Sequence, residues 1–322
     1  MLPAKDALTI CFAHVAYRLG DRFAARETGP RSFEVRTREE LEARIGEADV
    51  LVVSGLWRND LLPHAGRLKL IQSISAGVDQ YDQAALRAQG IRLASAQGVN
   101  ARAVAEHAMA LILALTRRLP EARDNQAKRN WRGMIGDLAQ REDELGGKTL
   151  LIVGLGRIGG RLAQLARAFD LRVIGVRRDP AQGPSSADEV HGLAALPTLL
   201  PRADLVALTC PLTPETENLI DAAALGLMQP SAFLVNAARG RCVDEDALAA
   251  ALTQGRIAGA ALDVTREEPL PATSPLWGMA NVLITPHTAG ETRRYEDNVL
   301  DLLMDNLDRL WRGETALGNQ EV

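Results

Sequence analysis

A glycine-rich hexapeptide that follows a short apolar run constrains the fold of this chain more than any other feature. Residues 149–153 form a run that can be buried on both faces of a parallel sheet. Gly154-Leu155-Gly156-Arg157-Ile158-Gly159 follows directly, and an amphipathic stretch with Leu162 and Leu165 comes next. A strand, a G-x-G-x-x-G turn and a helix in this order are typical of a dinucleotide-binding loop.

Each glycine has its own task in such a loop. Gly154 permits the tight turn, Gly156 lets the backbone approach a pyrophosphate, and Gly159 lets the helix pack closely on the strand. The first helical turn, from Arg157 and Ile158, offers N–H groups and the positive end of a helix dipole to phosphate. The alternative is a structural turn that merely needs glycines.

The residues after the next apolar run bear on the choice of cofactor. That run, 172–176, ends about twenty residues beyond the loop, where an NAD site normally carries an acidic residue for the ribose 2′-hydroxyl. Here the chain reads Arg177-Arg178-Asp179. Because guanidinium groups can hold a 2′-phosphate, Arg177 and Arg178 favour NADP. In the alternative, this is a solvated loop in which Asp179 accepts from the ribose, which would favour NAD.

The rest of the chain alternates short apolar runs with amphipathic stretches, the pattern of parallel strands joined by helical crossovers. A length of 322 residues suggests about two domains. We expect a discontinuous substrate domain over 1–99 and 290–322 and a dinucleotide-binding Rossmann domain over 100–289, both α/β folds with doubly wound parallel sheets. The expected strands are 8–13, 50–53 and 70–74 in the first domain, and 149–153, 172–176, 205–208, 233–235, 258–262 and 282–284 in the second.

Three helical segments complete this organisation. Residues 101–118 are rich in Ala and Leu without Gly or Pro, so we expect one helix that ends before Pro120 and a second to about Arg129. The stretch 290–311 predicts a helix that packs on the first domain. His107 is interpreted as a structural residue of its helix, and Trp131 as a packing residue.

Composition narrows the function classes. The net charge is −4, from 37 basic and 41 acidic residues that are spread along the chain, so neither nucleic acid nor an anionic membrane is an expected partner. The most apolar stretch, 104–115, is too short to span a membrane. Three widely spaced cysteines indicate neither a disulfide framework nor a zinc site, and no metal is expected. A reducing, intracellular setting fits the cysteine usage best, so we expect a cytoplasmic protein.

Polar residues follow three successive strands of the second expected domain. Arg239 follows 233–235, Glu268 follows 258–262, and His287 follows 282–284. The carboxyl ends of parallel strands are where a doubly wound sheet binds ligands. Hydride transfer from a nicotinamide needs a proton donor and a group that holds the substrate. Singly, each residue could be an ordinary surface or capping residue; together, past three strand ends, they indicate a catalytic site.

At this point the sequence resembles the D-isomer-specific 2-hydroxyacid dehydrogenase family, most closely its glyoxylate/hydroxypyruvate reductase branch. The resemblance covers nearly the whole chain. Besides the glycine loop, it is carried by Ser75-Ala76-Gly77-Val78-Asp79, Val104-Ala105-Glu106-His107, Pro211-Leu212-Thr213-Pro214-Glu215-Thr216, Ala238-Arg239-Gly240, Glu268-Pro269-Leu270 and Thr285-Pro286-His287. Arg177, where many members have Asp, is the chief departure, and it puts NAD in doubt.

The resemblance implies a role for each candidate. His287 would be the general acid/base that protonates the carbonyl oxygen of a 2-oxoacid as hydride arrives. Glu268 would hydrogen-bond the other ring nitrogen and fix the tautomer, and Arg239 would grip the substrate carboxylate. Backbone amides of Ala76, Gly77 and Val78, in a flavodoxin-like substrate domain, would bind the same carboxylate, in a cleft between the domains.

The resemblance also implies cofactor contacts and a partner. Asp263 would bind the nicotinamide carboxamide, and Cys210 with Ala237 would line the cofactor groove. The connector region that contains Lys128, Arg129, Trp131 and Arg132 resembles the family's dimer-forming part, which implies a homodimer. The expected reaction is reduction of glyoxylate or hydroxypyruvate to the D-2-hydroxyacid.

Several alternatives remain open. A D-3-phosphoglycerate dehydrogenase-like enzyme is one, although many of these carry a further regulatory domain. Formate dehydrogenases of this type pair the histidine with Gln, whereas this chain has Glu268. A non-catalytic corepressor-like protein that senses dinucleotide is the alternative from another class, and it would be expected to carry disordered flanks or peptide-docking extensions.

Overall fold

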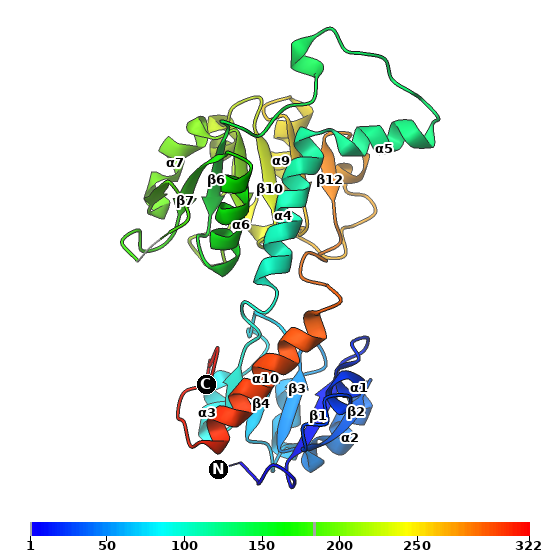
Figure 1. The fold of residues 1–322 in the computed structure, drawn as a ribbon, viewed down its shortest axis with the longest axis vertical. Helices are drawn as coiled ribbons and strands as arrows, with labels where there is room; N and C mark the ends of the chain where they lie inside the picture. The colour runs from blue at the N-terminus through cyan, green and yellow to red at the C-terminus, as the bar shows by residue number, and fades with distance from the viewer. Residues whose placement is uncertain (1, 183–184) are drawn as a thin grey trace. The chain divides into compact units, whose positions relative to one another are not determined.

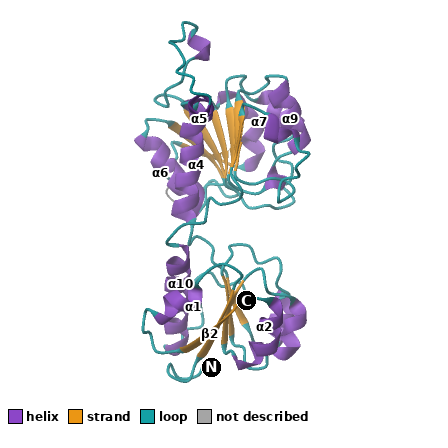
Figure 2. Cartoon of the chain, turned by 90° about the vertical axis from the view of Figure 1, so that its right-hand side faces the viewer, coloured by secondary structure: helices purple, strands orange, loops and turns teal. Residues whose placement is uncertain are grey.

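The computed structural model describes residues 2–182 and 185–322 and divides the chain into two compact units. Unit 1 comprises Met1–Asn100 and Thr292–Val322, and unit 2 comprises Ala101–Glu291. These bounds lie within two residues of the expected domain limits. Within each unit the strands form one parallel sheet with helices on both faces (Figures 1 and 2), which confirms the expected α/β class.

The sheet of unit 1 has five strands in the order β2-β1-β3-β4-β5, all parallel. This is the flavodoxin-like order. The strands are β1 (Thr9–Ala13), β2 (Arg31–Val35), β3 (Val50–Val53), β4 (Leu70–Ser73) and β5 (Arg92–Ala94). The sequence analysis missed β2 and β5, which are the two edge strands.

Alternate side chains of the central strands in unit 1 enter two separate cores. Cys11, Leu51 and Ile71 pack with α2 (Arg38–Arg44) and α3 (Gln83–Ala88) on one face. On the opposite face Ile10 and Val50 pack with α1 (Leu19–Ala24) and α10 (Tyr295–Trp311). The helix expected over 290–311 therefore begins at Tyr295 and covers the sheet of unit 1, as anticipated. Two 3-10 turns complete the unit: η1 (Ile45–Glu47) and η2 (Asn59–His64).

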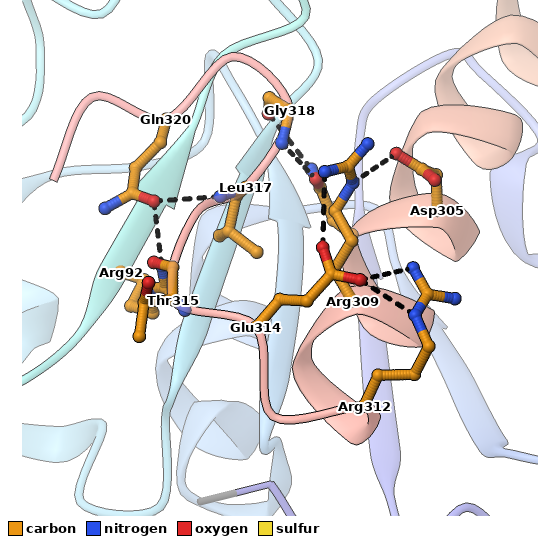
Figure 3. Close-up of polar contacts among 10 residues, drawn as sticks. Arg92, Asp305, Arg309, Arg312, Glu314, Thr315, Leu317, Gly318 and Gln320 are labelled. Carbon is orange, nitrogen blue, oxygen red and sulfur yellow. Dashed lines mark hydrogen bonds and ion pairs between the residues drawn. The ribbon is translucent and has the colours of Figure 1, made fainter.

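The segment after α10 closes one edge of this sheet. Figure 3 shows Glu314 accepting from Arg309 and Arg312, which holds the turn that leaves the helix. Gln320 then accepts from Arg92 at 2.7 Å and forms an antiparallel bridge with Ala94 of β5. β5, the last strand of the sheet, is therefore paired with β4 on one side and with the C-terminal segment on the other.

The sheet of unit 2 has seven parallel strands in the order β12-β11-β10-β9-β6-β7-β8. Six were expected; the seventh, β8, is a short partly exposed strand beside β7. The strands are β6 (Thr149–Val153), β7 (Arg172–Val176), β8 (Glu189–His191), β9 (Leu205–Leu208), β10 (Phe233–Asn236), β11 (Gly259–Leu262) and β12 (Val282–Ile284).

Helices again cover both faces of this sheet. On one face, Leu150, Ile152 and Val235 pack with α4 (Ala101–Thr116) and α6 (Arg157–Ala168). On the other face, Leu151, Val206 and Leu234 pack with the remaining helices of the doubly wound layer, which are α7 (Leu196–Leu199), α8 (Ala222–Leu227) and α9 (Glu245–Thr253). The 3-10 turns of the unit are η3 (Leu138–Gln140), η4 (Leu193–Ala195), η5 (Leu200–Arg202), η6 (Gly240–Cys242) and η7 (Pro275–Gly278).

The two helices expected around Pro120 are present with shorter bounds. α4 ends at Thr116, and α5 (Leu119–Ala127) begins with Pro120 in its first turn, where its missing N–H costs nothing. Trp131, interpreted as a packing residue, is instead 98% exposed, and Met134 beside it is fully exposed. Across the described residues, no helix combines the length and apolar character that a membrane crossing requires.

Candidate active site

The glycine loop lies at the carboxyl end of β6, where the chain turns sharply into α6. Gly154 has φ +103°, and a Cβ atom there would stand 2.4 Å from the backbone nitrogen of Cys210. A Cβ at Gly159 would stand 2.3 Å from the carbonyl oxygen of Gly154. Both positions therefore require glycine, the first for conformation and space and the second for space.

The middle glycine of the motif, Gly156, leaves room for a ligand. A Cβ at Gly156 would meet no atom within 4 Å, and Gly156 caps α6 without a side-chain hydrogen bond. The first turn of α6, from Arg157 and Ile158, thus begins beneath open space, and helix N-termini attract phosphate through N–H groups and the helix dipole. The cradle fits the pyrophosphate of a dinucleotide.

Basic residues follow β7 at the carboxyl ends of the strands, where the glycine loop also lies. Arg178 and Asp179 are exposed, and Arg177 is half-buried with a hydrogen bond to the carbonyl of Pro180 at 3.3 Å. The Asp179 carboxylate accepts from the backbone nitrogen of Ala181 at 3.0 Å, which ties it into its own turn.

The charge of Arg178 reaches the loop that follows β9. The pKa of Glu215 in that loop is lowered, chiefly by a hydrogen bond from the Thr213 hydroxyl and to a smaller extent by the Arg178 charge. The charge of Arg178 therefore acts on the loop between β9 and α8, which holds Glu215.

Cys210 and Ala237 lie at the carboxyl ends of neighbouring strands. Both are buried, and the backbone nitrogen of Ala237 donates to the carbonyl of Leu208 at 3.2 Å. The pKa of the Cys210 thiol is raised by its contact with the Cys242 thiol and by burial. Cys210 therefore stays protonated and offers packing rather than charge.

Glu268 and His287 form the closest pair of titratable groups predicted for the site. Glu268 Oε2 lies 2.7 Å from His287 Nδ1, and Glu268 Oε1 accepts from the backbone nitrogen of Thr265 at 3.1 Å. The side chains remain 39% and 49% exposed. The carboxylate thus fixes the imidazole through Nδ1 and leaves Nε2 for a ligand.

Arg239 follows β10 in a turn that a buried amide holds. The Asn236 side chain donates to the carbonyl of Arg239 at 3.0 Å and accepts from the Ala238 nitrogen at 3.0 Å. A Cβ at Gly240 would stand 1.9 Å from the carbonyl oxygen of Thr265. Gly240 therefore lets the turn that carries Arg239 lie directly against the segment that holds Glu268.

Asp263 does more in this structure than the sequence analysis assigned to it. Its carboxylate is 3% exposed and accepts from the hydroxyl of Thr285 at 2.7 Å and from the backbone nitrogens of Thr288 and Ala289 at 3.1 and 3.2 Å. The backbone nitrogen of His287 donates to the Asp263 carbonyl at 2.7 Å. Asp263 therefore holds the loop that carries His287; its predicted contact with the nicotinamide carboxamide stays a prediction.

His107 reaches the same loop from α4. Its Nε2 lies 3.0 Å from Thr285 Oγ1 and 3.5 Å from Asp263 Oδ1. The sequence analysis interpreted His107 as a structural helix residue, because helical spacing gives no signal for a contact across 178 positions.

The remaining predicted residues lie in unit 1. Ala76, Gly77 and Val78 follow β4, at the carboxyl edge of that sheet, and are exposed or half-buried. Ser73 shapes the start of this segment, since its hydroxyl donates to the carbonyl of Ser75 at 3.2 Å. Over residues 2–182 and 185–322, no three His, Cys, Asp or Glu side chains are grouped as metal ligands.

Comparison of the sequence and the structure with known proteins identifies the family that this chain matches. A family model described as D-isomer specific 2-hydroxyacid dehydrogenase, NAD binding domain, matches residues 109–289. The chain is 37% identical to a glyoxylate reductase of Thermofilum pendens over 290 residues, covering 89% of this chain and 86% of the relative. It is also 37% identical to a D-3-phosphoglycerate dehydrogenase of Methanocaldococcus jannaschii, covering 87% of this chain.

The share of each relative that this chain covers differs between the relatives. The chain spans 53% of the length of that D-3-phosphoglycerate dehydrogenase, about half. A crystal structure of a D-isomer specific 2-hydroxyacid dehydrogenase family protein from Aeromonas salmonicida matches 98% of this chain and 99% of its own, with a TM-score of 0.86 and 32% identity.

Proposed function

We propose that this chain, which belongs to the D-isomer specific 2-hydroxyacid dehydrogenase family, reduces a small 2-oxoacid of the glyoxylate or hydroxypyruvate type to the D-2-hydroxyacid. One observation carries the proposal: the 2.7 Å contact between Glu268 and His287, on the sheet whose edge also bears the glycine loop. A proton donor with a fixed tautomer beside a dinucleotide cradle suits carbonyl reduction.

In this proposal the residues of the chain divide the work of the reaction. A bound nicotinamide dinucleotide would supply the hydride. His287, held through Nδ1 by Glu268, donates the Nε2 proton to the carbonyl oxygen of the substrate. Arg239 binds the substrate carboxylate, because its planar fork matches the two oxygens. The backbone amides of Ala76, Gly77 and Val78 are proposed to bind the same carboxylate.

We further propose NADP as the preferred cofactor. The support is the pair Arg177 and Arg178 after β7, together with the engagement of the Asp179 carboxylate in its own turn. Positive charge favours a 2′-phosphate, whereas an available carboxylate would favour a 2′-hydroxyl. NAD is the alternative.

A D-3-phosphoglycerate dehydrogenase activity is the second candidate. The similarity to the Methanocaldococcus jannaschii protein favours it, although the chain spans about half of that relative. Both candidates use the same proton donor and carboxylate anchor, so only the substrate distinguishes them. Reduction of 3-phosphohydroxypyruvate at a higher kcat/KM than glyoxylate and hydroxypyruvate would favour this second candidate.

The test is the initial rate of nicotinamide oxidation with each 2-oxoacid, with NADPH and NADH in parallel. We expect turnover with glyoxylate or hydroxypyruvate that is lost in His287→Ala. We expect Arg178→Ala to reduce the preference for NADPH, whereas Arg167→Ala, an exposed arginine in the last turn of α6, should leave it unchanged. Absence of turnover with every acid and both cofactors would contradict the proposed activity.

We also propose a cytoplasmic homodimer. The support for self-association is the exposed apolar group Trp131, Met134 and Leu138 in the segment that follows α5, since exposed apolar clusters mark association surfaces. The support for the cytoplasm is that all three cysteines are free and buried. Sedimentation equilibrium should give twice the mass of the chain.

A further inference from the structure

We propose that His107 is a positioning residue for the proton donor, acting through Thr285 and Asp263 on the loop that carries His287. The chemical relevance of this role rests on the proposed function, but the role itself is a property of the loop. It assigns a task to a histidine that touches neither the candidate dyad nor the glycine loop.

The hydrogen-bond directions follow from the number of protons available. The Thr285 hydroxyl has a single proton, and its 2.7 Å contact with Asp263 Oδ1 uses it, because a carboxylate can only accept. Thr285 Oγ1 can therefore only accept from His107 Nε2, 3.0 Å away. His107 thus carries its proton on Nε2 and donates it into the relay from Thr285 to Asp263.

The loop needs this support because its backbone is strained. His287 has φ +56°, a left-handed conformation that is uncommon for residues other than Gly and persists only where surrounding contacts enforce it. Those contacts converge on Asp263, which accepts from three backbone nitrogens of the loop through its carboxylate and its carbonyl. The orientation of the Asp263 carboxylate therefore determines how firmly His287 is held.

His107 supplies a fixed reference for that carboxylate. α4 is anchored to the sheet by Val104, Ala108 and Leu111, which are buried in the core on its face of the sheet. The His107 side chain is 24% exposed and the Asp263 side chain 3%. The relay therefore connects a packed helix to a buried carboxylate through two side-chain hydrogen bonds.

The test compares two substitutions of His107 by hydrogen exchange of the peptide that covers 285–289, in the full chain without substrate. His107→Leu removes the donor. We expect the loop amides to exchange at least about fivefold faster, because the loop loses the stabilisation that one hydrogen bond provides. His107→Gln keeps a donor near the Nε2 position and should exchange as the unaltered protein does. His191→Leu removes a histidine from β8, at the opposite edge of the sheet, and should leave the 285–289 peptide unchanged.

A second variant protects the test against general destabilisation. Thr285→Val breaks the relay without altering α4, so it should accelerate the same amides, and adding His107→Leu to it should cause no further change. Additive effects in the double variant would overturn the proposal. So would unchanged exchange in His107→Leu, or acceleration spread equally over α4, β6 and the loop.

Kinetics supply the functional readout. We expect His107→Leu to lower kcat about fivefold or more with little change in the KM for the 2-oxoacid, and His107→Gln to restore kcat. If the unaltered protein reduces no 2-oxoacid, the proposed function fails, and hydrogen exchange still decides the role of His107. If kcat is unchanged while exchange rises, His107 holds the loop without positioning the proton donor, and the proposal is overturned.

Discussion

Replacing Glu268 by Gln tests the central pair of the site. The substitution preserves size but removes the charge and one acceptor. Glu268 accepts from His287 at 2.7 Å and from the Thr265 nitrogen at 3.1 Å, whereas the single amide oxygen of Gln can serve only one of these donors. Its NH₂ group would then face the other donor.

The expected loss follows from the hydrogen bond to the imidazole. A hydrogen bond to a charged group contributes about 1.5–3 kcal/mol, and the exposure of these side chains, 39% and 49%, reduces this to about 1–2 kcal/mol. At about 1.4 kcal/mol for each factor of ten, kcat should fall about 5- to 30-fold.

The assay is the steady-state rate of 2-oxoacid reduction at saturating cofactor. The matched control is Glu267→Gln, which removes the same charge from the exposed neighbouring residue. We expect the control to keep kcat within about twofold of the unaltered protein. Equal kcat values for Glu268→Gln and Glu267→Gln would refute the reasoning that the carboxylate fixes the imidazole.

Two further predictions concern stability. Gly154→Ala should lower the free energy of unfolding by about 2 kcal/mol or more, because Gly154 has φ +103° and a Cβ there would lie 2.4 Å from Cys210. Gly160→Ala, in open space inside α6, should instead raise the free energy of unfolding by about 0.5–1 kcal/mol. Chemical denaturation measures both changes. The pKa of Glu189 is lowered from 4.5 to about 2, first by Arg202 and then by His191 and Arg172, so its stabilising effect is full above pH 4.5 and is lost as pH falls through about 2. Glu189→Gln should therefore lower Tm near neutral pH, with a difference that shrinks between pH 4.5 and 2 in calorimetry, and a constant difference would contradict it.

Strands buried on both faces could be predicted from the sequence, whereas three of the four edge strands, β2, β5 and β8, could not; the fourth, β12, was predicted as 282–284. Residues 50–53 and 149–153 are continuous apolar runs, as expected for central parallel strands. β2 reads Arg-Ser-Phe-Glu-Val and β8 reads Glu-Val-His, because an edge strand keeps polar side chains toward solvent. Their pairing depends on the neighbouring strand rather than on a pattern of their own.

The candidate site divides in the same way between local and long-range information. The glycine loop is a local motif, and the strand ends that carry Arg239, Glu268 and His287 could be recognised one by one. The hydrogen bonds of His107 and Asp263 to the His287 loop could not, because they join segments far apart in the chain. The same holds for Gly240, whose need for a glycine appears only when Thr265 lies against it.

The division of unit 1 into two chain segments has a consequence for the order of folding. Unit 2 is contiguous, whereas unit 1 lacks α10 until the residues after Thr292 have been synthesised. Until then the face of β1 and β3 that α10 covers remains open to solvent. Folding of unit 2 brings the chain at Ala101 and Glu291 to a fixed separation, which shortens the loop that unit 1 must close and lowers its entropic cost. We therefore expect unit 2 to fold first during synthesis, and unit 1 to be completed when the fully buried side chains of α10 dock, namely Val299, Leu300, Leu303 and Leu307.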